Sequence, residues 1–291
     1  MYLQTSTTLS PNIVIKNLFS YLYQNLSEKE LSSILEIPIT KLELSRKEGL
    51  LDFDTFAKLK EKCGFSYANL YHKGLDHDCI LARLTQQSLP IPKRYTTCAY
   101  SSRMNSHNIL LNLSPEIRED AINFLQIEGH YFYSPQNITN KISTIINSDL
   151  LKYLVECHLF QPQDIYKLGQ MSGFYNLNLP FGYSFKGLSL KESFEKVTDE
   201  IVKHFETSFK YELISLTHNK AIIRKHFSEK MKEQLNQKTY SNQYLCKYIE
   251  GSFSAIALYT TRRLVRTSQE RCAFSGDSYS EFHIYLDELS G

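Results

Sequence analysis

The stretch "RCAFSGDSYSEFHIYL" (residues 271–286) decides the fold class of this chain. It predicts a strand, a tight Gly-Asp turn and a second strand, because such a turn between two strand-forming runs is typical of a β-hairpin. Phe282, Ile284 and Leu286 alternate with other residues, so the second strand should place them on the core face of a sheet. One thiol, Cys272, lies at the entrance to the turn, and its role depends on what the rest of the chain brings near it.

Upstream of this hairpin, helical and strand patterns alternate. A helix is predicted from apolar residues at spacings of three and four, which are Leu190, Phe194, Val197, Ile201 and Phe205. "FKYELISL" and "AIIRKHF" flank "THNK", which predicts another hairpin, and "NQYLCKYIEGSFSAIALYTTR" (242–262) predicts a long, largely buried helix. The order helix, hairpin, helix, hairpin predicts an α+β fold, with an antiparallel sheet and helices packed on one of its faces.

The N-terminal part, residues 1–75, is helical in pattern. Ser27 followed by Glu30 is a capping box, so a helix should begin there. Gly49 should end the next helix, "ITKLELSRKEG", and Asp54 is expected to cap the helix after it. These signals predict an all-helical N-terminal domain.

A helical middle region is predicted for residues 76–180, ahead of the α+β domain at 181–291. Helix-start signals occur at residues 114, 134 and 161, and in the first two a Ser can cap the helix and a Pro fits its first turn. "LPIPKRYTTCAYSSRMNSHN" (89–108) is the best candidate for a linker or exposed loop. "GQMSGFYNLNLPFGYSFKG" (169–187) is rich in glycine and aromatic residues, and we expect a structured loop there.

Residues 27–65 resemble the helix-turn-helix of the phage-repressor (XRE-type) regulators. The resemblance rests on "EKELSSILEI", a turn at Pro38, "TKLELSRKEG" and "DTFAKLKEKCGFS". In such proteins the second helix of the pair lies in the major groove of DNA. The resemblance implies that the following residues face base edges: Ile39, Thr40, Lys41, Glu43 and Leu44. It also implies phosphate contacts near Arg46 and Lys47.

This stretch carries less net positive charge than a domain that binds DNA tightly. Residues 11–75 contain nine Lys and Arg against eight Asp and Glu, and phosphate contacts by basic residues supply much of the affinity for DNA. Ile39 and Leu44 are aliphatic and Glu43 is acidic at positions that would face DNA. Two interpretations therefore stay open, DNA binding and a degenerate helix-turn-helix used by a protein-interaction adaptor.

Residues 188–286 resemble the 4-vinyl reductase-type small-molecule sensor domain. The resemblance rests on the order of elements, on "YIEGSFSAIALY" and on "ERCAFSGDSYSEFHI". The ending of that family typically carries a cysteine on either side of the turn; Cys272 matches the first, and Ser280 stands at the second. The resemblance implies an α+β domain that senses a small molecule or a partner.

An aromatic cluster lies where the middle region meets this domain, and its members are Phe174, Tyr175, Phe181, Tyr183 and Phe185. Ligand cavities are mostly apolar with few polar groups, so the cluster can line a pocket for a small hydrophobic or aromatic ligand. Ordinary packing of the segment against the sheet explains the same residues. Both interpretations stay open.

Metal binding and catalysis have weaker support in the sequence. Six cysteines are dispersed without a CxxC pair, and a zinc site at the terminal hairpin would need about four ligands. Cys246 and His283 could join Cys272 only if the fold brings them close, so we expect Cys272 to be a packed thiol. We expect no metal, no other cofactor and no catalytic residues, and hence no enzyme, because GxSxG, P-loop, GxGxxG and HExxH motifs are absent.

The composition narrows the class of protein. A formal net charge of +2 excludes a globally basic nucleic-acid coat protein but says nothing against a local patch. The sequence has neither a signal-peptide pattern nor the run of about 20 apolar residues needed to cross a bilayer. We therefore expect a cytoplasmic protein with no membrane partner.

Together the patterns and the two resemblances predict a one-component bacterial transcription regulator. A small hydrophobic or aromatic ligand, or a peptide or protein partner, would bind one arrangement of the sensor better and so shift the population that binds double-stranded DNA. A helix-turn-helix protein usually reads two half-sites one helical turn apart, so we expect a homodimer.

Overall fold

The computed structural model describes residues 10–96, 100–133, 141–177, 180–201, 206–235 and 243–286. Contacts divide the chain into two compact units. The described residues of 10–96 and 115–131 form the N-terminal unit, and those of 100–114 and 132–286 form the C-terminal unit. The predicted α+β class is confirmed by helices in both units and a four-stranded antiparallel sheet in the C-terminal one.

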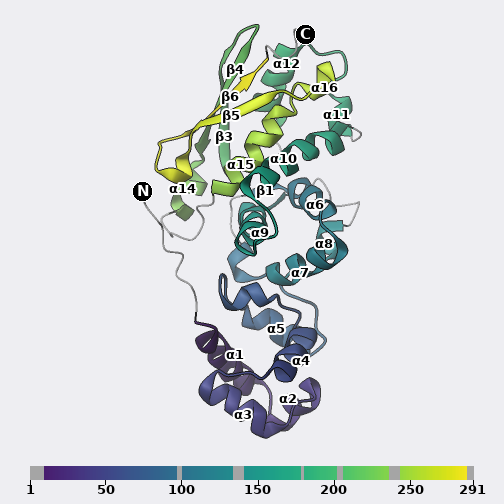
Figure 1. The fold of residues 1–291 in the computed structure, drawn as a ribbon, viewed down its shortest axis with the longest axis vertical. Helices are drawn as coiled ribbons and strands as arrows, with labels where there is room; N and C mark the ends of the chain where they lie inside the picture. Colours follow the sequence, from purple (N-terminus) through teal and green to yellow (C-terminus); the bar gives the residue numbers. More distant parts are fainter. Residues whose placement is uncertain are drawn as a thin grey trace. The chain divides into compact units, whose positions relative to one another are not determined.

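The N-terminal unit is helical (Figure 1). Its α-helices are α1 (Pro11–Asn25), α2 (Glu28–Leu35), α3 (Ile39–Glu48), α4 (Phe53–Cys63), α5 (His77–Leu84) and α7 (Pro115–Leu125), and its 3-10 turns are η1 (Tyr67–Leu70) and η2 (Lys93–Tyr95). Helices α1 to α5 and η1 enclose one apolar core, whose members include Val14, Leu18, Phe19, Leu22, Leu31, Leu35, Leu42, Leu59 and Phe65.

The ends of α2, α3 and α4 follow local signals. The capping box at α2 is confirmed, because the Ser27 side chain accepts a hydrogen bond from the backbone of Glu30 and the Glu30 carboxylate accepts one from the backbone of Ser27. Gly49 ends α3 with a φ of 69°. Asp54 was expected to cap α4, but the cap is Asp52, whose carboxylate accepts a hydrogen bond from the Thr55 backbone at 2.7 Å.

The C-terminal unit combines helices with two sheets. Its helices are α6 (Arg103–Leu111), α9 (Thr144–Glu156), α10 (Pro162–Leu177), α11 (Pro180–Tyr183), α12 (Leu190–Glu195), the π-helical η4 (Lys196–Ile201), α14 (Glu229–Leu235), α15 (Gln243–Ser254) and α16 (Leu258–Thr261); α8 (His130–Tyr133) lies where the chain enters this unit for the second time. Strands β1 (Tyr100–Ser102) and β2 (Lys141–Ser143) form a short pair. The main strands are β3 (Phe209–Leu216), β4 (Lys220–Phe227), β5 (Arg266–Arg271) and β6 (Ser280–Tyr285), with a 3-10 turn, η5 (Ala273–Ser275), before β6.

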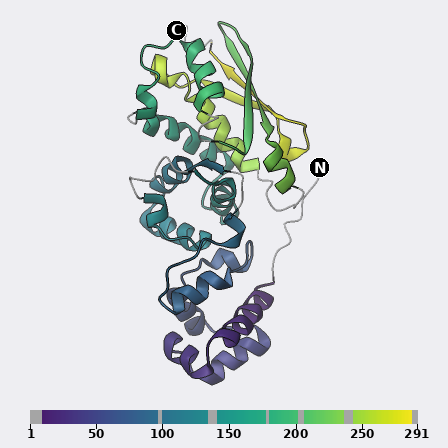
Figure 2. The same ribbon diagram turned by 180° about the vertical axis from the view of Figure 1, so that it is seen from behind.

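The main sheet confirms both predicted hairpins. Its strand order is β3-β4-β6-β5, and every neighbouring pair is antiparallel. Phe282 and Ile284 are fully buried and Leu286 nearly so, as the alternation in β6 predicts. Apolar residues of α12, η4, α15 and the turn after it complete this core, and both ribbon views show the helices on one side of the sheet (Figures 1 and 2).

The close packing of α10 on α15 corrects the expected loop at 169–187. Residues 169–177 continue α10, because Gly169 and Gly173 serve helix–helix contact and not a turn. A Cβ atom on Gly169 would lie 2.1 Å from the Tyr248 carbonyl oxygen, and one on Gly251 would lie 2.0 Å from the Tyr166 carbonyl oxygen. The two helices approach each other this closely because glycine leaves room for the opposing backbone.

Two further expectations are corrected. The helix predicted over 242–262 ends as α15 at Ser254, where i→i+3 hydrogen bonds such as Ala255 to Ser252 tighten the last turn. The expected exposed loop at 89–108 becomes α6 from Arg103 onward and is largely buried. Its polar side chains tolerate burial because they are paired, as Asn108 is with Ser172 at 3.2 Å.

The predicted helix starts at 114 and 161 are confirmed by α7 and α10, whereas the signal at 134 lies outside the described residues. Within the described ranges, no helix is both long and apolar enough to cross a bilayer.

Candidate functional site

Helix α3 exposes most of its surface to solvent. Only Leu42 and Ser45 of its ten residues are buried. Thr40, Leu44 and Lys47 recur at helical spacing along the exposed side. Of the other residues predicted to face DNA, Ile39 and Glu43 are half-buried and Lys41 and Arg46 are exposed. The structure therefore places all the predicted DNA-binding residues on one short helix.

Two cations of α3 already have partners within the protein. Lys41 donates a hydrogen bond to Asp52 at 2.6 Å, and this pair raises the pKa of Lys41 and lowers the pKa of Asp52. The Arg46 guanidinium lies 4.7 Å from the centre of the Tyr23 ring. Lys47 has no ion-pair partner among the described residues, so its charge is the most available to an external anion.

An apolar groove of about 360 Å³ lies in the same unit, between the start of α1 and the segment that joins α3 to α4. Its lining includes Ile15, Leu50, Phe53, Phe56, Tyr67 and Tyr71. The side chain of Phe53 is 83% exposed, and Leu50 and Tyr67 are about half exposed. Such an apolar surface favours a protein contact rather than a phosphate contact.

The aromatic residues predicted to bind a ligand are spread over separate surfaces. Phe174 and Tyr175 lie on the exposed side of α10, and Tyr183 is 65% exposed on α11. Phe185 is fully buried and stacks on Tyr259 with 4.5 Å between ring centres. The side chain of Phe181 lies outside the described ones.

A buried polar cluster lies under the terminal hairpin. Lys225 on β4 is only 1% exposed, and its ammonium lies 3.1 Å from the Cys246 sulfur on α15. The Ser280 hydroxyl lies 3.6 Å from the same sulfur. Three rings surround the ammonium, with centres at 4.3 Å for Phe209, 5.1 Å for Phe274 and 6.0 Å for Phe282.

Cys272 joins this cluster from the segment after β5. Its thiol is half-buried, whereas that of Cys246 is fully buried. The backbone N–H of Ala273, the residue after Cys272, donates to the Ser280 hydroxyl at 3.0 Å. The interaction between the two thiols lowers the pKa of Cys272 to about 5, and the same interaction together with burial raises the pKa of Cys246. Burial also raises the pKa of the nearby Glu206 to about 8, against the opposing effects of hydrogen bonds from Ser208 and of the Lys225 charge.

The sequence signals found only part of this cluster. Cys246 does approach Cys272, but the other proposed helper, His283, lies on the opposite face of β6, as its position between the inward-facing Phe282 and Ile284 requires. Lys225 was missed, although alternation with Ala221 and Ile223 places it on the inner face of β4. Within the described ranges, no three His, Cys, Asp or Glu side chains gather in a way that could hold a metal.

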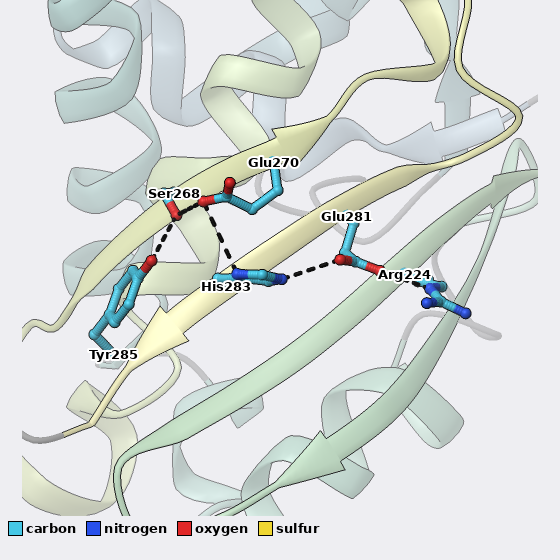
Figure 3. Close-up of polar contacts among 6 residues, drawn as sticks. All are labelled: Arg224, Ser268, Glu270, Glu281, His283 and Tyr285. Carbon is cyan, nitrogen blue, oxygen red and sulfur yellow. Dashed lines mark hydrogen bonds and ion pairs between the residues drawn. The ribbon is translucent and has the colours of Figure 1, made fainter.

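The outer face of the sheet carries a different polar network (Figure 3). Arg224 donates to Glu281 at 2.7 Å, and His283 lies 3.0 Å from Glu281 on one side and 3.9 Å from Glu270 on the other. Ser268 links Glu270 to Tyr285. The hydrogen bond from Arg224 lowers the pKa of Glu281, which keeps this carboxylate ionised.

Comparisons with known proteins do not identify the chain. No family model matches it, and no curated protein matches it. Among solved structures it is similar to a trafficking protein particle complex subunit 3 from Naegleria fowleri, covalently bound to palmitic acid. The identity is 17%, the match covers 47% of this chain and 91% of that chain, and the TM-score is 0.32, which does not establish a shared fold.

Proposed function

We propose that this chain is a DNA-binding transcriptional regulator whose C-terminal unit senses a small molecule or a partner. The supporting observation is the exposure of α3, which buries only Leu42 and Ser45 and carries Thr40, Leu44 and Lys47 along its free side. A helix that contributes so little to its own core has a surface available for recognition.

In this proposal the N-terminal half of α3 enters the major groove. Thr40 and Lys41 approach base edges, and Lys41 exchanges its hydrogen bond with Asp52 for one to DNA. Glu43 accepts a hydrogen bond from a cytosine amino group, which is the base contact that a carboxylate favours. Arg46 and Lys47 contact phosphates, which position the helix without reading sequence.

The regulator acts as a homodimer, because two half-sites need two copies of α3. Ligand or partner binding to one arrangement of the C-terminal unit shifts the population toward or away from the spacing that fits DNA. Light scattering of the purified protein, free and bound to duplex DNA, measures the stoichiometry, and a one-to-one complex at saturation contradicts the dimer.

Replacing Lys47 with alanine should weaken binding to duplex DNA by about 3- to 10-fold at 0.1 M salt and reduce the salt slope by about one unit. The reason is that Lys47 is exposed and has no ion-pair partner among the described residues, so its loss removes one phosphate contact without breaking an internal bond. Fluorescence anisotropy of a labelled duplex across a salt series measures both quantities.

The matched control is Lys186→Ala, which removes the same charge from an exposed position of the C-terminal unit. It should leave affinity and slope unchanged. Absence of any binding by micromolar wild-type protein to duplex DNA at low salt contradicts the proposal.

A second candidate function is a protein-interaction adaptor, and the apolar groove beside α1 favours it. Phe53→Ser should then abolish capture of a partner protein from a lysate of the source cells, because it removes the most exposed aromatic ring of the groove. Phe174→Ser, at a 46% exposed ring on α10, is the matched control and should leave capture unchanged. Equal capture by both variants, measured by quantitative mass spectrometry, contradicts the adaptor.

A further inference from the structure

The outer face of the main sheet lies opposite the helices that share its apolar core, and it is open to solvent. Apolar residues of α12, η4 and α15 pack on the inner face, and both ribbon views show these helices on that side (Figures 1 and 2). Alternate residues of each strand form the outer face, because successive side chains of a strand point to opposite faces. Exposed side chains occur on both edge strands, Glu212 on β3 and Arg266 on β5.

Tyr285 forms one aromatic position on this face, at the end of β6. The Arg266 guanidinium lies 4.3 Å from the centre of its ring, and the Lys220 ammonium lies 5.8 Å from the same centre. The Ser268 hydroxyl lies 3.2 Å from the Tyr285 hydroxyl. The ring is therefore held between the two neighbouring strands and lies within cation–π range of two cations.

Tyr279 forms a second aromatic position, directly before the first residue of β6. The guanidinium groups of Arg224 and Arg271 lie 4.6 Å and 5.4 Å from its ring centre. The His226 ring is also close, with 5.6 Å between ring centres. Six residues of extended chain separate this position from Tyr285, which is a span of about 20 Å.

Positive charge exceeds negative charge on the outer face. Among the described residues it carries five Lys and Arg against three Glu, namely Lys210, Lys220, Arg224, Arg266 and Arg271 against Glu212, Glu270 and Glu281. Each carboxylate also has a partner within the face, as Glu281 has Arg224 at 2.7 Å. An approaching anion therefore meets cations that lie beside exposed rings.

This combination fits a ligand that has both negative charge and flat apolar rings. In single-stranded nucleic acid, bases stack on aromatic rings and on Arg guanidinium planes while Lys and Arg contact the phosphates. A duplex offers the same phosphates, but its bases are already stacked on one another. An acidic peptide would pair with the cations and leave the two aromatic positions unused.

We propose that the outer face of the main sheet binds single-stranded nucleic acid. One base stacks beside Tyr285 and another beside Tyr279, on the ring or on the guanidinium that covers it. Figure 3 shows His283 and its carboxylate partners between Tyr285 and Arg224, where they offer donors and acceptors to base edges. The inference goes beyond the proposed function, because this surface belongs to the C-terminal unit and does not involve α3.

Fluorescence anisotropy of a labelled deoxythymidine strand of about 12 nucleotides, added to the full-length protein, tests the stacking role. Tyr285→Ala should weaken binding by about 5- to 100-fold, because one stacked base loses its platform. Tyr285→Phe keeps the ring and should bind within about twofold of the wild type. The matched control is Tyr183→Ala, which removes a 65% exposed ring from α11 and should leave binding unchanged.

Two variants of Arg266 separate stacking from charge. Arg266→Lys keeps the charge but loses the planar guanidinium, so binding should weaken by at least about threefold with an unchanged salt slope. Arg266→Ala should in addition reduce the slope by about 0.7, because one phosphate contact to a single strand is lost. If Tyr285→Ala does not fold, this pair carries the test.

An abasic strand of the same length carries the same phosphates without bases, and it should bind at least about tenfold more weakly. Equal affinity for the two strands overturns the proposal and favours an acidic protein partner. A uridine strand and a deoxyuridine strand of equal length then distinguish the source of the ligand. Tighter binding of the uridine strand assigns RNA, and equal binding assigns single strands of either kind; both support the proposal.

Two further results overturn the inference. One is the absence of any single-strand binding by micromolar protein at low salt. The other is single-strand binding that Lys47→Ala weakens and Tyr285→Ala does not, because it would place the ligand on α3. The outcome is separate from that of the duplex experiment. Binding of single strands without duplex binding supports the inference and contradicts the regulator, whereas duplex binding without single-strand binding does the reverse.

Discussion

Replacing Gly251 with valine is expected to lower the free energy of unfolding of the C-terminal unit by about 3 kcal/mol or more. A Cβ atom at this position lies 2.0 Å from the Tyr166 carbonyl oxygen and 3.1 Å from the backbone nitrogen of Gln170. Both are backbone atoms of α10, so a rotamer change cannot relieve the overlap. The helix itself has to move away, and the packing it shares with α15 is lost over several turns.

Urea unfolding followed by far-ultraviolet circular dichroism measures this change. The matched control is Gln243→Val, which introduces the same side chain at an exposed position of the same helix and should cost less than about 1 kcal/mol. A Gly251→Val protein as stable as the control would show that α10 and α15 are farther apart than described.

Truncating Phe282 to alanine is expected to cost about 3–5 kcal/mol. Phe282 is fully buried on β6, a central strand of the sheet, and packs edge-on against Phe253 with 5.1 Å between ring centres. Its ring also covers the Lys225 ammonium, so the truncation opens a cavity beside a buried charge. The loss therefore exceeds that of an ordinary apolar contact.

The neighbouring position provides the control for Phe282. His283 points to the outer face, between Glu281 and Glu270, and His283→Ala should cost about 1 kcal/mol through lost hydrogen bonding. Denaturant unfolding of both variants under the same conditions tests the assignment of faces. A larger loss for His283→Ala would mean that β6 is shifted by one residue, because such a shift exchanges the two faces of a strand.

Structural features that depend on residues close together in the sequence were predicted correctly. The capping box joins Ser27 to Glu30 three positions later, and the inward set of β6 follows from a period of two. Where the same residue type is compatible with two local structures, the prediction was wrong. Gly169 was interpreted as part of a loop, but its missing side chain is needed by another helix, and Asp52 took the capping role expected of Asp54.

The candidate sites also differ in whether neighbouring residues in the sequence or contacts between distant elements form them. The residues predicted to face DNA are close in sequence, so a single helix places them together without further information. The aromatic residues from 174 to 185 span two helices and a turn, and their exposure depends on which side of α10 meets α15. Phe185 became core because it stacks on Tyr259 and packs in the core of the main sheet, while Phe174 and Tyr183 face solvent.

The amino-acid sequence was sufficient for the α+β class, for both hairpins and for the inward face of β6, because side-chain period and turn chemistry act over short distances along the chain. It was not sufficient for the role of the thiol in "RCAFSGDSYSEFHIYL". Lys225 and Cys246 come from a strand and a helix, and only the strand register and the packing of α15 on the sheet bring them to 3.1 Å from each other, beside the turn that carries Cys272. Such convergence depends on long-range packing, which no local spacing records.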